Sequence, residues 1–267
     1  MKAVLTVAGS DCSGGAGIQA DLKTILSHGA YGMSVITALT AQNTTGVSGI
    51  AKVEAEFIGM QMDAVFTDLV PDAVKIGMIQ GAQAVHVVSQ RLRKYAAKQV
   101  VIDPVLASTS GTRLMEEEAL ECALEELFPL AALLTPNIPE AEVLTGISIK
   151  NADDMQLAAK AAAKRFGCAV LCKGGHLAGA ADDLLYDGGQ FYWMRAQRIS
   201  NPNTHGTGCT LSAAAACGLA EGRKMPDAVL RAKEYVAGAI LDGLDLGAGR
   251  GPLNHGYQVF KTTVEKE

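Results

Sequence analysis

The strongest constraint on the fold is the way in which short apolar runs alternate with longer stretches of helical periodicity. The apolar runs occupy residues 3–7, 34–39, 74–76, 100–102, 133–134 and 169–171. They lack polar alternation, which is typical of strands buried on both faces of a parallel sheet. Between them, apolar residues recur at three- and four-residue spacing in residues 54–69, 82–95, 116–127 and 153–166. The alternation predicts βαβ units around a mostly parallel sheet.

One segment departs from this pattern. Residues 182–194 contain two β-prone arms on either side of Asp187-Gly188-Gly189, which predicts an antiparallel hairpin at one edge of the sheet. No Pro/Ser-rich linker, low-complexity tract or internal repeat divides the sequence. We therefore expect residues 1–267 to form a single α/β domain of the doubly wound type, with helices on both faces. Such sheets bind ligands beyond the carboxyl ends of their strands.

The composition excludes several classes of protein. Hydrophobic residues make up 49% of the chain and charged residues 19%, which rules out a disordered, collagen-like or coiled-coil chain. The net charge of −5 argues against a nucleic-acid partner. No apolar run approaches the ~18 residues that span a bilayer, and the opening run stops at Ser10, too short for a secretory signal. We expect a cytoplasmic protein with no membrane partner.

The 29 glycines indicate many tight turns, and several of them cluster after the first predicted strand. Residues 8–21 contain Gly9, Gly14, Gly15 and Gly17 and lead into a helix. Glycines allow positive φ and a close backbone approach, and the N–H groups at a helix start attract negative charge. The segment is neither a P-loop nor a regular G-x-G-x-x-G, so it could be only a turn. Asp21 could be a solvated helix residue or a carboxylate facing a ligand.

A second glycine-rich turn, in residues 203–214, precedes a helix of small residues. Consecutive N–H groups from Gly206 to Cys209 would form an anion hole at the positive helix terminus. Such a hole would suit a phosphoryl group in transfer. We expect Cys209 there to have a lowered pKa and to accept a substrate proton as a thiolate. The alternative is a small residue packed at a helix start, which is also how we interpret the other cysteines, because the six form no C-x-x-C pair.

Polar residues follow three more predicted strands. Asp103 ends one buried strand, Asn137 and Glu140 come just beyond another, and Lys173 ends a third before two glycines. Asp103 and Glu140 are candidates to hold a hydrated Mg²⁺, which prefers oxygen ligands. Asn137 and Glu140 could equally be helix caps that need no metal. Lys173 could meet polyphosphate or be a solvated strand end.

These residues stand in motifs that resemble hydroxymethylpyrimidine/phosphomethylpyrimidine kinases of thiamine biosynthesis, in the ribokinase superfamily. The resemblance runs from about residue 3 to His255. It rests, in chain order, on residues 8–21 (AGSDCSGGAGIQAD), 75–78 (KIGM), 102–105 (IDPV), 135–140 (TPNIPE), 173–176 (KGGH) and 205–212 (HGTGCTLS). It implies a ribokinase-like fold, with a mostly parallel central sheet, and phosphoryl transfer from ATP with Mg²⁺.

The resemblance also implies roles for individual residues. Asp21 and Gln42 would bind the aminopyrimidine, in a pocket lined by Gly9, Met78 and Val105. Asp103 and Glu140 would act around Mg²⁺. The residues that would meet ATP are Asn137, Lys173 and Thr204. Gly206, Thr207 and Gly208 would form the anion hole, and Cys209 would be the catalytic proton acceptor, at a position where most sugar kinases of the superfamily carry Asp.

Gln42 supports the pyrimidine as substrate, because its amide offers both a donor and an acceptor to a 4-aminopyrimidine. Pyridoxal kinases of the same branch tend to carry an apolar residue there, so the resemblance leaves pyridoxal kinase activity as the alternative. A non-catalytic ligand sensor is a remote alternative, since Asp103, Glu140, Lys173 and Cys209 are all present. The resemblance also implies a homodimer, although no residue pattern identifies an interface.

Overall fold

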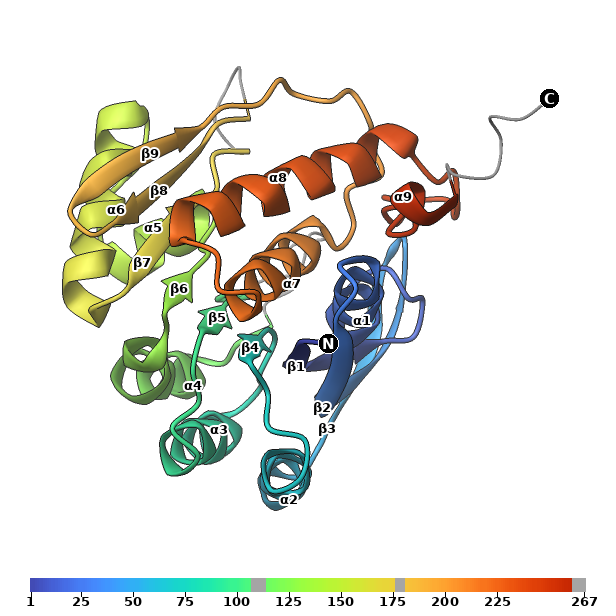
Figure 1. Ribbon diagram of the computed structural model, residues 1–267, viewed down its shortest axis with the longest axis vertical. Coiled ribbons are helices and arrows are strands. Elements are labelled where there is room, and N and C mark those ends of the chain that lie inside the picture. Colours follow the sequence, from blue (N-terminus) through green and yellow to red (C-terminus); the bar gives the residue numbers. More distant parts are fainter. Residues whose placement is uncertain (107–113, 176–180, 261–267) are drawn as a thin grey trace.

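The computed structural model describes residues 1–106, 114–175 and 181–260, and these residues form one α/β layer structure (Figure 1). Within them, nine strands form a single sheet in the order β3-β2-β1-β4-β5-β6-β7-β8-β9. The strands are β1 (Ala3–Asp11), β2 (Tyr31–Asn43), β3 (Gly46–Lys52), β4 (Ala73–Ile76), β5 (Val100–Ile102), β6 (Leu133–Leu134), β7 (Ala169–Cys172), β8 (Asp183–Asp187) and β9 (Gln190–Met194).

The centre of the sheet is parallel and its two edges are antiparallel. Strands β2, β1, β4, β5, β6 and β7 run parallel to their neighbours, which confirms the predicted βαβ arrangement. At one edge β8 and β9 form the predicted hairpin around Gly188 and Gly189. At the other edge β3 pairs antiparallel with β2. The alternation of apolar runs does not predict β3, because its sequence, GVSGIAK, is rich in small and polar residues.

Helices cover both faces of the sheet. In the described residues these are α1 (Gly17–Ser27), α2 (Ala55–Phe66), α3 (Ala82–Lys94), α4 (Glu117–Cys122), α5 (Ile138–Thr145), α6 (Ala152–Phe166), α7 (Thr207–Ala220), α8 (Met225–Asp242) and α9 (Tyr257–Phe260). A π-helical turn (Ala123–Leu127) and a 3₁₀ turn (Phe128–Leu130) continue α4. Helices α1, α7 and α8 lie on one face, and α2 to α6 lie on the other (Figure 1).

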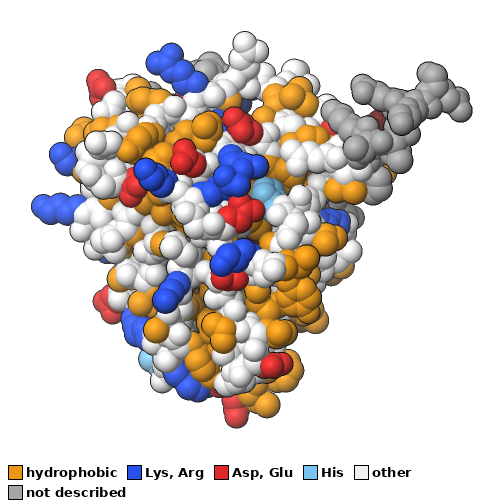
Figure 2. Space-filling view, viewed as in Figure 1, with side chains coloured by type: hydrophobic (Ala, Val, Ile, Leu, Met, Phe, Trp, Pro, Cys, Tyr) orange, Lys and Arg blue, Asp and Glu red, His pale blue; other side chains and the backbone are white. Residues whose placement is uncertain are grey.

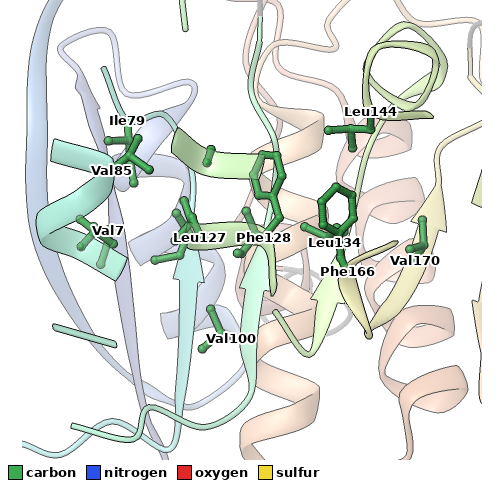
Figure 3. Packing of buried hydrophobic residues seen from close by; sticks show 14 of the residues in the cluster. Val7, Ile79, Val85, Val100, Leu127, Phe128, Leu134, Leu144, Phe166 and Val170 are labelled. Atoms are coloured by element: carbon green, nitrogen blue, oxygen red, sulfur yellow. The ribbon is translucent and has the colours of Figure 1, made fainter. Parts of the chain in front are cut away.

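The two faces of the sheet pack in different ways. On the face of α2 to α6, large side chains interlock, and the rings of Phe128 and Phe166 meet edge to face at 5.6 Å (Figure 3). On the other face α7 is built from small residues, and every residue from Thr210 to Ala220 is buried. Small side chains let a helix approach the strands closely, so the start of α7 is held firmly at one end of the sheet.

A charged pair lies buried between the sheet and the helices α1 and α7. Lys75 on β4 and Asp21 on α1 are both 0% exposed, and Lys75 Nζ donates to Asp21 Oδ2 at 2.8 Å. Thr6 on β1 donates to the same oxygen at 2.6 Å. Burial disfavours the ammonium, but the adjacent Asp21 carboxylate outweighs this effect and raises the pKa of Lys75. The pair therefore stays ionised inside the protein.

The surface carries exposed hydrophobic side chains on one flank. Tyr31 and Leu39 on β2 and Phe57 and Met60 on α2 are each about half exposed or more. Figure 2 shows hydrophobic side chains gathered over this flank of the molecule, with charged residues of both signs intermixed across the middle of the same view. The homodimer stays a prediction. Of the helices in the described parts of the chain, none has the length and apolar character needed to cross a bilayer.

We predict that Lys75→Met lowers the free energy of unfolding by about 3–5 kcal/mol, because it leaves the Asp21 carboxylate buried without its partner. The double variant Asp21→Leu/Lys75→Met removes both charges and should be considerably more stable than the single variant. Urea unfolding of the three proteins measures this difference. A double variant no more stable than Lys75→Met would contradict the role assigned to the pair.

Candidate active site

A cavity of about 730 Å³ opens at the carboxyl ends of the parallel strands, where a doubly wound sheet is expected to bind its ligand. The residues that line it include Gly9, Asp11, Gln42, Met78, Asp103, Val105, Asn137, Glu140, Lys173, Thr204, His205, Gly206, Thr207, Gly208, Cys209, Lys233 and Arg250. A second hollow of about 540 Å³ lies at the amino ends of β6 and β7. It contains none of the predicted site residues, so the first cavity is the candidate site.

Asp11 organises the glycine-rich turn at the start of α1. Its carboxylate accepts hydrogen bonds from the N–H groups of Ser13 (2.9 Å) and Ala16 (2.8 Å) and from the Ser13 hydroxyl (2.8 Å). The Nε2 atom of the His205 ring lies 2.8 Å from Asp11 Oδ2. Burial works to raise the pKa of Asp11, but the bonds from His205 and Ser13 outweigh it and lower the pKa to about 2. Asp11 is therefore an ionised anchor for this turn.

The start of α7 faces the cavity with its positive end. Gly206 adopts a φ of 83°, and a Cβ at this position would lie 1.9 Å from the carbonyl oxygen of Gly15, so only glycine fits. Within the described residues, no side chain caps this helix. The N–H groups of Gly208 and Cys209 belong to the first turn, which has no intrahelical acceptors. The N–H of Thr207, a member of the predicted anion hole, donates instead to the Thr204 carbonyl at 3.3 Å. The N–H groups of Gly208 and Cys209 are therefore the ones placed to meet an anion, and the anion hole stays a prediction.

The thiol of Cys209 differs from the sequence-based prediction. The prediction was a pKa lowered by the helix terminus, but burial raises the pKa of Cys209 to about 11. The Lys75 ammonium and the N–H of Gly17 act in the opposite direction without overcoming burial. The helix-terminus argument fails because it neglects the cost of desolvating a thiolate. Cys209 is therefore a protonated thiol at neutral pH in the unliganded protein.

Asp103 and Lys173 form an ion pair against the first turn of α7. Lys173 Nζ donates to Asp103 Oδ1 at 2.7 Å, and Thr135 Oγ1 donates to the same oxygen at 3.1 Å. A Cβ at Gly208 would lie 3.1 Å from Asp103 Oδ2 and 3.4 Å from Lys173 Nζ. The glycine therefore lets a carboxylate and an ammonium reach the helix terminus together.

Asn137 and Glu140 form a capping box at the start of α5. The Asn137 side chain accepts from the Glu140 N–H at 2.9 Å, and the Glu140 carboxylate accepts from the Asn137 N–H at 2.8 Å. This is the capping alternative of the sequence analysis, and both residues also line the cavity. Burial and the nearby Asp103 carboxylate raise the pKa of Glu140 to about 7. Two carboxylates thus share one region of the cavity wall, although the described residues contain no cluster of three or more metal-ligating side chains.

The amide of Gln42 contacts the His205 ring and Thr40. One terminal atom of the amide lies 3.1 Å from His205 Nε2, and the other lies 3.2 Å from Thr40 Oγ1. Because Asp11 is an ionised acceptor, the proton of His205 must be on Nε2, and only the amide oxygen can accept a bond from it. Thr40 Oγ1 donates to the Ser10 carbonyl at 3.0 Å and so can accept from the amide nitrogen. We therefore assign the Gln42 amide oxygen to the His205 side and the amide nitrogen to the Thr40 side.

All of the predicted site residues line this cavity except Asp21. Asp21 does not line the cavity, because its carboxylate is buried in the pair with Lys75, and its role in binding the pyrimidine stays a prediction. His176, which belongs to a motif that supports the resemblance, lies outside the described residues. The sequence analysis did not identify Asp11 and His205 as site residues, although each stands next to a glycine-rich turn that it did identify.

The opposite end of the cavity is mostly apolar. It is formed by Leu211 of α7, by Val236 and Ile240 of α8, and by Ile199 and Pro202 of the segment before α7. Lys233 Nζ is tied there to Asp183 Oδ2 at 2.6 Å. The cavity therefore has a polar end at Gln42, an apolar end at α8, and the N-terminus of α7 in its wall.

Known proteins match this chain over nearly its whole length. The sequence model of the family described as phosphomethylpyrimidine kinase matches residues 11–254. A hydroxymethylpyrimidine/phosphomethylpyrimidine kinase of Streptomyces coelicolor is 51% identical over 255 residues, which cover 95% of this chain and 94% of the relative. The thiamine biosynthesis bifunctional protein ThiED of Geobacter sulfurreducens is 50% identical over 253 residues, 94% of this chain and 52% of the relative. The chain thus spans about half the length of that bifunctional relative.

Solved structures resemble the fold closely. A phosphomethylpyrimidine kinase of Clostridium difficile is 45% identical with a TM-score of 0.81, and the match covers 90% of this chain and 100% of that one. A pyridoxal kinase of Bacillus subtilis in complex with ADP is 34% identical with a TM-score of 0.90, over 97% and 99% of the two chains. Both likenesses support the ribokinase-like fold.

We predict that Asp11→Asn lowers the free energy of unfolding by ~2 kcal/mol near pH 6, because a carboxyl with a pKa depressed by nearly two units stabilises the folded state by about that amount. The contribution is present in full above the unfolded-state pKa and is lost as the pH falls through the folded-state value of about 2. Urea unfolding at pH 6 and pH 3 should therefore show a loss at pH 3 about half as large. A loss that does not depend on pH would contradict the role of the ionised carboxylate.

Proposed function

Because the chain belongs to the phosphomethylpyrimidine kinase family, we propose that it transfers a phosphoryl group from ATP to 4-amino-5-hydroxymethyl-2-methylpyrimidine in thiamine biosynthesis. The same site would then transfer a second phosphoryl group to the monophosphate and give the pyrophosphate. The observation that carries this proposal is one cavity that contains both the Gln42 amide and the N-terminus of α7. The first suits a small aminopyrimidine, and the second suits the transferring phosphoryl group.

ATP fits the cavity with its base toward α8 and its phosphates toward α7. The apolar surface of Leu211, Val236 and Ile240 suits a planar base, while Lys173 at the first turn of α7 suits the polyphosphate. Asn137 and Thr204 line the same cavity and would contact the nucleotide. The pyrimidine would then occupy the end at Gln42, between Gly9, Met78 and Val105.

The residues present fit a magnesium ion. Mg²⁺ keeps several waters and takes only one or two carboxylates besides phosphate oxygens, so Asp103 and Glu140 would suffice to hold it. The charge of Asp103 already raises the pKa of Glu140. A divalent cation would relieve this repulsion between the two carboxylates. Bound with ATP, the ion would neutralise charge on the phosphate oxygens during transfer.

In the first transfer, the hydroxymethyl oxygen bonds to the γ-phosphorus of ATP while the bond from that phosphorus to the β,γ-bridging oxygen breaks. ADP leaves with the electron pair of the broken bond, and the hydroxyl proton passes to Cys209 Sγ as a thiolate. The N–H groups of Gly208 and Cys209 stabilise the charge on the moving phosphoryl group. The ammonium of Lys75 and the N–H of Gly17 are the groups that favour the thiolate form.

Pyridoxal kinase activity is the alternative on this scaffold, and a solved relative is a pyridoxal kinase. The amide of Gln42 argues against it, because it is partly buried and offers a donor and an acceptor that match the edge of an aminopyrimidine. The test of the proposed function is an assay with MgATP and each of three acceptors, the hydroxymethylpyrimidine, its monophosphate and pyridoxal. We expect kcat/KM for both pyrimidines to exceed that for pyridoxal, and the reverse order would overturn the assignment.

We predict that Gln42→Met lowers kcat/KM for the hydroxymethylpyrimidine by about 10- to 100-fold, because it removes the donor and acceptor that pair with the pyrimidine edge. The kcat/KM for pyridoxal should change far less, since the amide has no such partner there. Gln90→Met, an exposed substitution on α3, serves as the control. Equal losses for both acceptors would remove the reason for preferring the pyrimidine.

Cys209→Ala should lower kcat for the first transfer by at least ~100-fold with little change in the KM for ATP, because it removes the proton acceptor. The second transfer should suffer much less. Its acceptor is a phosphate monoester whose second pKa is near 6, so above that pH the attacking oxygen has no proton to lose. Cys122→Ala on α4 controls for the loss of a thiol away from the cavity.

The pH profile gives an independent check on Cys209. A pKa raised to about 11 makes the thiolate scarce at neutral pH, and its fraction grows about tenfold per pH unit below that value. The rate of the first transfer in the native protein should therefore rise steeply between pH 7 and pH 9, and the Cys209→Ala variant should lose this slope. A flat profile in the native protein would leave catalysis to the anion hole and the metal ion.

A further inference from the structure

The charges that line the cavity are mostly paired. Lys173 is paired with Asp103 at 2.7 Å, and Lys233 is paired with Asp183 at 2.6 Å. Arg198, the third lining cation, donates to a backbone carbonyl at 3.1 Å. Arg250 also lines the cavity, and among the described residues its guanidinium has neither a hydrogen bond nor an ion pair. Its charge is therefore available to a ligand.

The backbone of Arg250 is fixed although its side chain is not. The N–H of Arg250 donates to the Thr44 carbonyl at 3.1 Å, and the N–H of Gly251 donates to the Asn203 side chain at 2.9 Å. A Cβ at Gly249 would lie 2.1 Å from the Thr44 oxygen, and one at Gly251 would lie 2.6 Å from the Asn203 oxygen. Two glycines that tolerate no side chain thus hold one arginine at the cavity rim.

This rim belongs to the pyrimidine end of the cavity. Thr44, which accepts the Arg250 N–H, follows Gln42 by two residues in the chain. On the other side, the Gly251 carbonyl accepts the His205 N–H at 3.1 Å, and the His205 ring contacts the Gln42 amide. Thr44 and His205 thus each connect Gln42 with the segment that carries Arg250. The arginine therefore lies beside the site proposed for the acceptor.

We propose that Arg250 binds the phosphate of the acceptor when the acceptor is a phosphate monoester, a role that rests on the proposed function. A monophosphate brings a dianion next to the polyphosphate of ATP, and like charges at close range repel strongly. A planar guanidinium can bind two phosphate oxygens at once, which offsets this repulsion and orients the third oxygen. An uncharged hydroxymethyl acceptor brings no second phosphate next to ATP, so its binding does not need the guanidinium.

The second transfer then balances without a base. The unbound phosphate oxygen of the acceptor bonds to the γ-phosphorus of ATP, the bond from that phosphorus to the β,γ-bridging oxygen breaks, and ADP leaves with the electron pair. No proton moves, because the acceptor is already a dianion. Arg250 keeps its two hydrogen bonds to what becomes the inner phosphate of the product.

The test compares Arg250→Gln, Arg250→Lys and the native protein with the two pyrimidine acceptors. We expect Arg250→Gln to lower the ratio of kcat/KM for the monophosphate to kcat/KM for the alcohol by about tenfold or more, through a higher KM for the monophosphate. Arg250→Lys should recover part of that ratio, since lysine keeps the charge but not the bidentate geometry. Arg223→Gln, which breaks a surface pair with Glu221, is the matched control and should leave the ratio as it is.

Calorimetric titration with the monophosphate alone, without ATP, measures phosphate binding independently of phosphoryl transfer. Weaker binding to Arg250→Gln than to the native protein supports the phosphate site, whichever acceptor is turned over. Equal losses of kcat/KM for the two acceptors, or an unchanged affinity for the monophosphate, would overturn it. A native protein that phosphorylates neither pyrimidine would instead overturn the proposed function.

Discussion

The close packing of α7 against the strands is the constraint on which the rest of the site depends. Its small residues, buried from Thr210 to Ala220, let the helix lie directly on the sheet, and the close approach of Gly206 to the Gly15 carbonyl fixes where it begins. The positive end of α7 is thereby held at the edge where parallel strands end. The ion pair of Asp103 with Lys173 lies against that point.

The charged side chains near the start of α7 form two ion pairs, one below the cavity and one in its wall. Lys75 and Asp21 neutralise each other beneath the floor, and Lys173 neutralises Asp103 in the wall. A polyphosphate with a divalent cation can then enter without leaving a buried charge unpaired. The thiol of Cys209 stays protonated beside these pairs because its burial disfavours the thiolate more than the Lys75 ammonium and the Gly17 N–H favour it. The ion pairs that keep these buried charges neutralised in the folded protein therefore also prepare the cavity for a charged ligand.

Much of this arrangement can be predicted from the sequence, because strand ends and glycine turns are local features. The parallel strands, the edge hairpin and the residues that follow each strand, such as Asp103 and Lys173, all lie where the pattern placed them. The edge strand β3 escapes prediction because its identity depends on pairing with β2 and not on its own residues. The burial of Asp21 and the raised pKa of Cys209 could not be predicted from the sequence for a related reason. Both depend on how closely α1 and α7 pack on the sheet, which spacing along the chain does not record.

A crystal structure with magnesium, the non-hydrolysable ATP analogue AMP-PCP and the hydroxymethylpyrimidine tests the central claim most directly. The start of α7 should bind the terminal phosphoryl group through the N–H groups of Gly208 and Cys209, with the hydroxymethyl oxygen beside Cys209 Sγ and the pyrimidine on the Gln42 amide. A terminal phosphoryl group bound away from the first turn of α7 would contradict the account.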